Sequence, residues 1–142
     1  MLLIDVNVLV YAHRGDSDSH DAWSTWLGSR VNGSEPWALT VGTLSGFLRI
    51  VTNHRVFSIP TPLADALAFV DALCESDTLV VLGPGPKNRS IFLDLVQQTE
   101  ARGKHIPDAE FAAIAIEHGC ELASADRDFS RYPGPRYRHP LR

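Results

Sequence analysis

The stretch from Ile106 to Phe129, IPDAEFAAIAIEHGCELASADRDF, contains the pattern that decides the fold. Asp108 follows Pro107, and this pair favours the first turn of a helix. The apolar run Ala112–Ile116 continues that helix until Gly119, which favours its end. The sequence therefore predicts a helix of about 11 residues, roughly 16 Å long, that begins at Asp108.

The residues after this helix lead back to the level at which it began. A buried strand is expected over Cys120–Ala125, and at about 3.3 Å per residue it covers nearly the length of the helix in the opposite direction. Asp126 then returns to the level of Asp108. In open parallel α/β sheets this is the carboxyl edge of the strands, where ligands bind.

The rest of the chain alternates between short apolar runs and amphipathic segments. The expected strands are Met1–Ile4, Trp37–Thr40, Thr78–Leu82, Cys120–Ala125 and an edge strand within Tyr137–Leu141, and the other expected helices are Asp5–His13, His20–Val31, Thr43–Thr52, Leu63–Glu75 and Asn88–Ala101. This alternation predicts an α/β fold with a mostly parallel sheet of four or five strands and helices on both faces. We expect one domain spanning residues 1–142.

Composition excludes several classes of protein. A hydrophobic share of 44% and a charged share of 21% are typical of a soluble globular protein. Cys74 and Cys120 are expected to be buried reduced thiols, and the scattered histidines do not indicate zinc. Neither a signal peptide nor a membrane span of about 20 apolar residues is present, so we expect a cytoplasmic protein. The GPGP sequence at 83–86 lacks the Lys-Ser/Thr of a phosphate-binding loop.

The net charge of −4 is unevenly distributed along the chain. Residues 127–142 carry five arginines and one aspartate, which gives this tail +4 and leaves −8 on residues 1–126. With Lys104 and His105, the tail forms a candidate basic rim for RNA, because phosphate neutralisation supplies much of the affinity for nucleic acid. Arg49, Arg127 and Arg131 are candidate phosphate contacts, although solvated side chains are the simpler interpretation.

Carboxylates are the candidate catalytic groups. If the first and fourth strands are neighbours, Asp5, Asp108 and Asp126 converge at the carboxyl edge, and Asp128 follows in the same loop. Carboxylates this close repel one another unless a cation neutralises them, and all-oxygen ligation favours Mg²⁺ or Mn²⁺. Such an ion supports phosphodiester hydrolysis. The alternative is that Asp5, or Asn7 beside it, only caps a helix and that Asp126 and Asp128 only stabilise a turn.

Three segments together resemble a known family over nearly the full length. MLLIDVNVLVYA (1–12), GFLRIVTNHRVF (46–57), and IPDAEFAAIAIEHG (106–119) with SADRDFSRYPG (124–134) are similar to the PIN-domain ribonuclease toxins of the bacterial VapBC type. The resemblance implies a three-layer α/β/α sandwich and an endoribonuclease dependent on Mg²⁺ or Mn²⁺. It also implies a toxin that cuts tRNA or ribosomal RNA loops and stops translation, a VapB antitoxin whose C-terminal segment enters the active-site groove, and a homodimer.

Matched to the family, the metal-binding and catalytic aspartates are Asp5, Asp108 and Asp126, with Asn7 beside the first and Asp128 as an accessory acid. One position departs from the family. PIN nucleases usually carry a glutamate in the helix after the second strand, and Gly46 stands there in this chain. A single-ion site is therefore one expectation, and Asp65, Asp94 and Glu110 are candidate substitutes for the missing carboxylate.

Two rival functions remain open from the sequence. With Gly46 in place of an acid, the chain is compatible with a catalytically weak module that binds RNA or a partner without cutting. Asp5-Val6-Asn7 also resembles the Asp-x-Asp of aspartyl-phosphate phosphatases, but Asn7 cannot serve as their general acid.

Overall fold

The fold is built around a five-stranded parallel sheet. The computed structural model describes residues 1–142, and the strand order is β3-β2-β1-β4-β5, with every neighbouring pair parallel. The strands are β1 (Leu2–Ile4), β2 (Trp37–Thr40), β3 (Leu79–Leu82), β4 (Glu121–Ala123) and β5 (Arg136–Arg138). The first and fourth strands are neighbours, with Ile4 opposite Ala123, as the convergence of the aspartates required.

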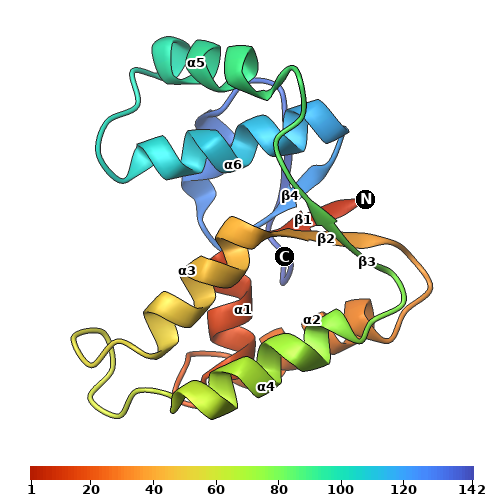
Figure 1. Cartoon of the computed structure of the whole chain (residues 1–142), viewed down its shortest axis with the longest axis vertical. Coiled ribbons are helices and arrows are strands. Elements are labelled where there is room, and N and C mark those ends of the chain that lie inside the picture. Colours follow the sequence, from red (N-terminus) through yellow and green to blue (C-terminus); the bar gives the residue numbers. More distant parts are fainter.

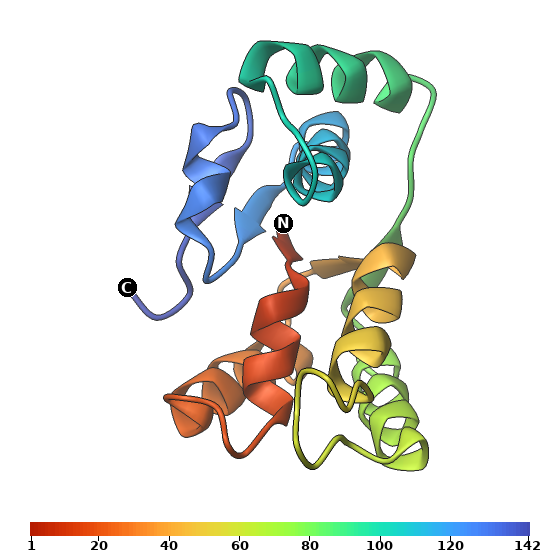
Figure 2. The same ribbon diagram turned by 90° about the vertical axis from the view of Figure 1, so that its left-hand side faces the viewer.

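Helices cover both faces of this sheet. Figure 1 shows α5 (Asn88–Thr99) and α6 (His105–His118) on one side. On the other side lie α1 (Val6–His13), α2 (His20–Val31), α3 (Val41–Val51) and α4 (Leu63–Cys74). Figure 2 shows the same separation after a quarter turn. The predicted three-layer α/β/α sandwich with a parallel sheet is therefore confirmed, at the upper end of the expected number of strands.

Successive side chains of the central strands β1 and β2 point to opposite faces of the sheet, and this divides the core into two clusters. Ile4, Trp37 and Leu39 are fully buried in the cluster beneath α1–α4. Leu3, which precedes Ile4, and Ala38, which lies between Trp37 and Leu39, are buried with α5 and α6. Successive side chains of a strand point to opposite faces, so both faces of β1 and β2 must be apolar, and these runs are continuously hydrophobic for that reason.

Several helices and strands begin or end at other residues than predicted. The helix that we expected to begin at Asp108 begins at His105, so Asp108 lies within its first turn. Pro107 is tolerated there because the first N–H groups of a helix need no intrahelical partner. The fifth strand covers Arg136–Arg138 rather than Tyr137–Leu141, although it is an edge strand as expected.

Two predictions of burial were wrong. The apolar spacing of the segment Leu63–Glu75 predicts that Leu67 lies on the buried side of the helix with Ala66 and Leu73, but Leu67 is 44% exposed on α4, whereas Ala66 and Leu73 are buried. Cys74 is exposed at the end of α4, while Cys120 is buried, and both thiols are free. Cys74 is the last residue of α4, where the helix frays, so the apolar character of its side chain did not ensure burial.

None of the helices combines the length and the apolar composition needed to cross a membrane.

Candidate functional site

The carboxyl ends of three adjacent strands place polar side chains at the same level. Asp5 follows β1, Ser124 follows β4, and Thr40 ends β2. The registers pair Ile4 with Ala123 and Leu3 with Ala38, and the Asp5 N–H donates to the Ala123 carbonyl at 2.9 Å. The sheet edge that the sequence indicated is therefore assembled by strand pairing.

The side-chain carboxylate of Asp5 accepts three hydrogen bonds. Its Oδ1 accepts from the Val6 N–H at 2.7 Å, which makes Asp5 the N-cap of α1. Its Oδ2 accepts from Asn7 Nδ2 at 2.8 Å and from Ser124 Oγ at 2.7 Å. Asp5 therefore caps α1, as the alternative interpretation of this residue held. It also makes a second set of contacts across the sheet edge.

Ser124 is a member of this network that the sequence did not reveal. Its side chain is fully buried, and its Oγ accepts from Asn7 Nδ2 and from the Asp126 N–H, each at 3.0 Å, while it donates to Asp5. Asn7 Oδ1 also accepts from the Ala125 N–H at 3.1 Å. A small polar residue directly after the buried pair Leu122 and Ala123 was the signal that could have identified it.

Burial dominates the electrostatics of Asp5. Desolvation raises the pKa of its carboxyl from 3.8 to about 6, against the opposing effect of the hydrogen bonds from Ser124 and Val6. The negative charges of Asp108 and Asp126 add to this rise. Asp108 and Asp126 are therefore close enough to Asp5 to oppose its ionisation.

Asp108 belongs to the same acidic group and reaches it from α6. Burial raises the pKa of its carboxyl, the neighbouring His105 lowers it, and the charges of Asp126 and Asp128 raise it further. His105 Nδ1 lies 3.5 Å from Asp108 Oδ2. Asp108 is half-buried and does not cap its helix, in contrast to Asp5.

Asp126 and Asp128 lie at the start of a short 3₁₀ helix, η1 (Arg127–Arg131). Asp126 is its N-cap, and its Oδ1 accepts from the Asp128 N–H at 2.8 Å. Asp128 is exposed. The turn proposed as the alternative for these two acids is therefore present. Its position still leaves both charges close enough to Asp108 to raise the pKa of that carboxyl.

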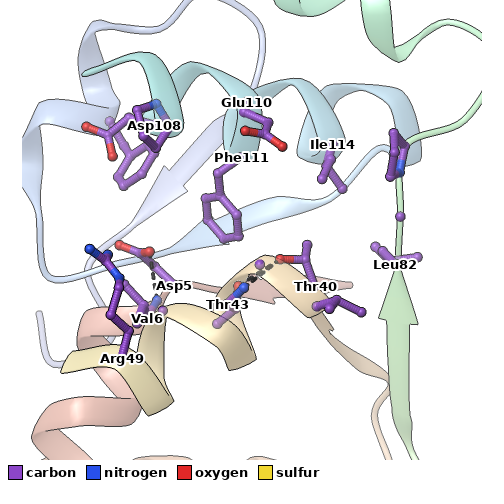
Figure 3. Close-up of a pocket in the computed structure, with 17 residues that line it drawn as sticks. Asp5, Val6, Thr40, Thr43, Arg49, Leu82, Asp108, Glu110, Phe111 and Ile114 are labelled. Carbon is purple, nitrogen blue, oxygen red and sulfur yellow. Dashed lines mark hydrogen bonds between the residues drawn. The ribbon is translucent and has the colours of Figure 1, made fainter. Parts of the chain in front are cut away.

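A cavity of about 340 Å³ opens beside these acids. Figure 3 shows Asp5, Asp108 and Arg49 at one end of it, and Leu82, Thr40 and Ile114 toward the other, with Phe111 between them. The cavity is lined by Asp5, which follows β1, and by residues of α1, β2, α3, β3, the β3–α5 connection, α6 and the short η1 helix. Asp5 and Asp108 line it, whereas Asp126 and Asp128 do not.

Gly46 lies on the wall of this cavity, at the position of the expected glutamate. A Cβ on Gly46 would lie 3.3 Å from Val6 Cγ2, so the side chain that approaches this glycine closely is Val6. Of the acids named as candidate substitutes for the missing carboxylate, Glu110 lines the cavity. Asp65 and Asp94 are exposed on α4 and α5 and do not line it.

The predicted substrate contacts differ in their surroundings. Arg49 lines the cavity, is exposed and forms no ion pair, so its guanidinium is available to an anion. Arg127 and Arg131 are exposed on η1 outside the cavity. The polar atoms of Asn7 are used by Asp5, Ser124 and Ala125, which leaves a positioning role for this side chain and no proton for the phosphatase alternative.

No three His, Cys, Asp or Glu side chains are arranged to hold a metal ion as they stand. The donor set nevertheless fits a hard divalent cation. Asp5 and Asp108 both resist ionisation because of burial and of the charges of neighbouring aspartates, and a bound cation would offset both effects. Their oxygens are the ligand type that Mg²⁺ and Mn²⁺ prefer.

Comparisons with known proteins agree with this arrangement. The family model described as "PIN domain" matches residues 2–135. Ribonuclease VapC25 of Mycobacterium tuberculosis is 41% identical over 140 residues, which cover 99% of both chains.

Two solved structures share the fold. VapBC2 from Rickettsia felis, solved with a DNA fragment of its promoter, matches with a TM-score of 0.70 at 17% identity over 96% of both chains. VapC20 of Mycobacterium tuberculosis, described as a sarcin-ricin loop cleaving toxin, matches with a TM-score of 0.69 at 14% identity over 96% of this chain and 99% of that one. Sequence and fold together show that this chain belongs to the PIN-domain family, in the group of proteins named VapC.

Proposed function

We propose that this protein is a Mg²⁺- or Mn²⁺-dependent endoribonuclease, the toxin of a toxin–antitoxin pair, which cleaves loops of tRNA or ribosomal RNA and so inhibits translation in the cytoplasm. One observation carries the proposal. Asp5 and Asp108, far apart in sequence, line one cavity, burial raises the pKa of both carboxyls, and Arg49 in the same cavity forms no ion pair. The ribonuclease relatives support the reaction, and VapC20 makes a ribosomal RNA loop one reasonable substrate.

The residues of this chain would divide the work as follows. Asp5 and Asp108, with help from Asp126, would hold the cation, and Asp128 would add negative charge at the edge of the site. When bound there, such an ion lowers the pKa of a water molecule and offsets charge on the phosphate oxygens. Ser124 and Asn7 keep the Asp5 carboxylate in place through the bonds described above.

Arginines would position the RNA. Arg49 shares the cavity with Asp5 and Asp108, so it is placed to meet the phosphate that is cut. Arg127 and Arg131 lie outside the cavity on η1, where they would contact neighbouring phosphates. Single-stranded loops suit such a site because their bases and backbone are not held in an A-form stem.

The proposal includes a protein partner. One solved structure with this fold is described as a toxin–antitoxin complex from Klebsiella pneumoniae, and two others as VapBC2 from Rickettsia felis and FitAcB from Neisseria gonorrhoeae. We expect a VapB-like antitoxin whose segment occupies the cavity and excludes RNA. The family resemblance adds a homodimer, which size-exclusion chromatography with light scattering would test.

Cleavage of purified tRNA and ribosomal RNA tests the reaction. The wild-type protein should give discrete products with Mn²⁺ and none with EDTA. Asp108→Asn should abolish cleavage, because it removes a cavity carboxylate without removing a helix cap. Asp94→Asn, an exposed acid on α5, should cut as the wild type does. Cleavage that survives both EDTA and Asp108→Asn would refute the proposed site.

The second candidate is a catalytically weak module that binds RNA or a partner. The glycine at position 46, on the cavity wall where a carboxylate was expected, favours it. Mn²⁺ should raise the melting temperature of a nuclease with a working ion site, because a ligand that binds only the folded state stabilises it. A folded, antitoxin-free protein with no cleavage and no Mn²⁺-dependent rise would favour the binding module.

A further inference from the structure

The cavity contains an apolar end that the proposed hydrolysis does not use. Five residues there, which we call the base pocket, come from three separate elements and the β3–α5 connection: Val41, Leu82, Pro84, Phe111 and Ile114. Val41 is 68% exposed, an unusual state for a branched apolar side chain at the mouth of a cavity. A ligand that entered the cavity would cover it.

We propose that the base pocket receives one unpaired RNA base next to the phosphate that is cut, with the base ring against Phe111. The inference rests on the proposed function, since it takes that phosphate to lie at Asp5 and Asp108. A base and its neighbouring phosphate are joined through a single ribose. The base and the phosphate would therefore occupy the two ends of one cavity of about 340 Å³.

Phe111 is suited to hold a base. In Figure 3 it projects between the acidic end and the apolar end of the cavity. Its ring makes an edge contact with the buried Phe129, with ring centres 5.8 Å apart and planes at 62°. A ring fixed in this way gives a base a stacking surface at little further cost in side-chain entropy.

Polar groups at the pocket would meet the edge of the base. Thr40 Oγ1 and Thr43 Oγ1 lie 3.0 Å apart, and Thr40 Oγ1 also accepts from the Thr43 N–H. The two hydroxyls share one hydrogen atom between them, so one O–H remains free to donate in the lining of the cavity. The Glu110 carboxylate, also in the lining, would accept from a base N–H.

The test uses a single-stranded oligoribonucleotide that spans a cut mapped in the RNA digest. One base near the cut at a time is replaced by an abasic ribose. For the wild-type protein, one such replacement should lower kcat/KM about ten- to hundredfold, the range expected for a base stacked on an aromatic ring. For Phe111→Leu the intact oligonucleotide should lose a similar factor, and the same abasic replacement should then cost little more.

Two further variants keep the test independent of folding. Phe92→Leu removes a partly buried ring of α5 that does not line the cavity, so it controls for the loss of an aromatic side chain. Val41→Ser changes an exposed side chain and should lower kcat/KM without lowering the melting temperature. Equal abasic penalties in wild type and Phe111→Leu would overturn the proposal, as would wild-type kinetics for both cavity variants, which would leave the apolar end to a protein partner.

Failure of the nuclease proposal can be told apart from failure of this one. If the wild-type protein cuts no RNA, the affinity of fluorescein-labelled oligo-A, oligo-C, oligo-G and oligo-U is measured in EDTA by anisotropy. Weaker binding by Phe111→Leu and Val41→Ser but not by Phe92→Leu would support the base pocket. Equal affinity for all four proteins, or no binding by any, would overturn it.

Discussion

The raised pKa of Asp5 predicts that this carboxylate destabilises the metal-free protein at neutral pH. The folded state raises the pKa from 3.8 to about 6. At about 1.4 kcal/mol per pH unit, this difference corresponds to about 3 kcal/mol. Since the folded-state pKa is the higher one, the full stability is present below 3.8 and is lost as the pH rises through about 6.

Asp5→Asn isolates this effect. The asparagine should cost about 1–3 kcal/mol at every pH, because its single amide oxygen cannot accept both from the Val6 N–H and from Asn7 and Ser124, as the two carboxylate oxygens do. Its stability relative to the wild type should then improve by about 2 kcal/mol between about pH 4 and about pH 7, where most of the Asp5 titration falls. Asp94→Asn is the matched control for the change in net charge.

Urea denaturation in EDTA at the two pH values measures this difference, with far-UV circular dichroism as the probe. Saturating Mn²⁺ should raise the stability of the wild type at neutral pH more than that of Asp5→Asn, because the ion favours the ionised carboxylate. A stability difference between wild type and Asp5→Asn that is the same at both pH values would refute the assignment of a raised pKa to burial at this site.

Three further predictions concern the surroundings of the site. Ser124→Ala should lower the free energy of unfolding by about 2 kcal/mol, since it leaves one of the two Asn7 Nδ2 hydrogens and the Asp126 N–H without an acceptor; urea denaturation checks this against the exposed Ser90→Ala. Gly46→Glu should tighten Mn²⁺ binding about tenfold in calorimetry by returning a carboxylate to the cavity, and unchanged affinity in a folded variant would contradict it. Glu117→Gln should speed hydrogen exchange at the Gly85 and Lys87 amides, which now donate to that carboxylate at 2.8 and 2.9 Å.

The sequence predicted the parts of the fold that depend on local pattern. The helix–Gly119–strand sequence placed Asp108 and Asp126 at one edge because helix rise and strand rise are fixed quantities. The start of α6 was misplaced by three residues, since Pro107 is compatible with several positions in a first turn. The exposure of Leu67 depends on what packs against α4, which no local pattern records.

The charged residues of the candidate site could be predicted from the sequence, but the residues that contact them across the fold could not. Asp5 and Asp108 were identified from their places after a strand and in a helix start, and both line the cavity. Ser124 was missed because its role arises only from the pairing of β1 with β4, which brings residues 119 positions apart within 2.7 Å. Phe111 was missed because an aromatic residue in an apolar helix is ordinarily part of the core.

The acids of this site differ in how strongly they are tied to the fold. Asp5 caps α1 and Asp126 caps η1, so their removal changes helix ends as well as the charge of the cavity. Asp108 caps nothing, and its Oδ2 lies 3.5 Å from Nδ1 of His105 within its own helix. A loss of cleavage in Asp108→Ala would therefore report on the chemistry of the site, whereas the same loss in Asp5→Ala or Asp126→Ala would also include the cost of a lost helix cap.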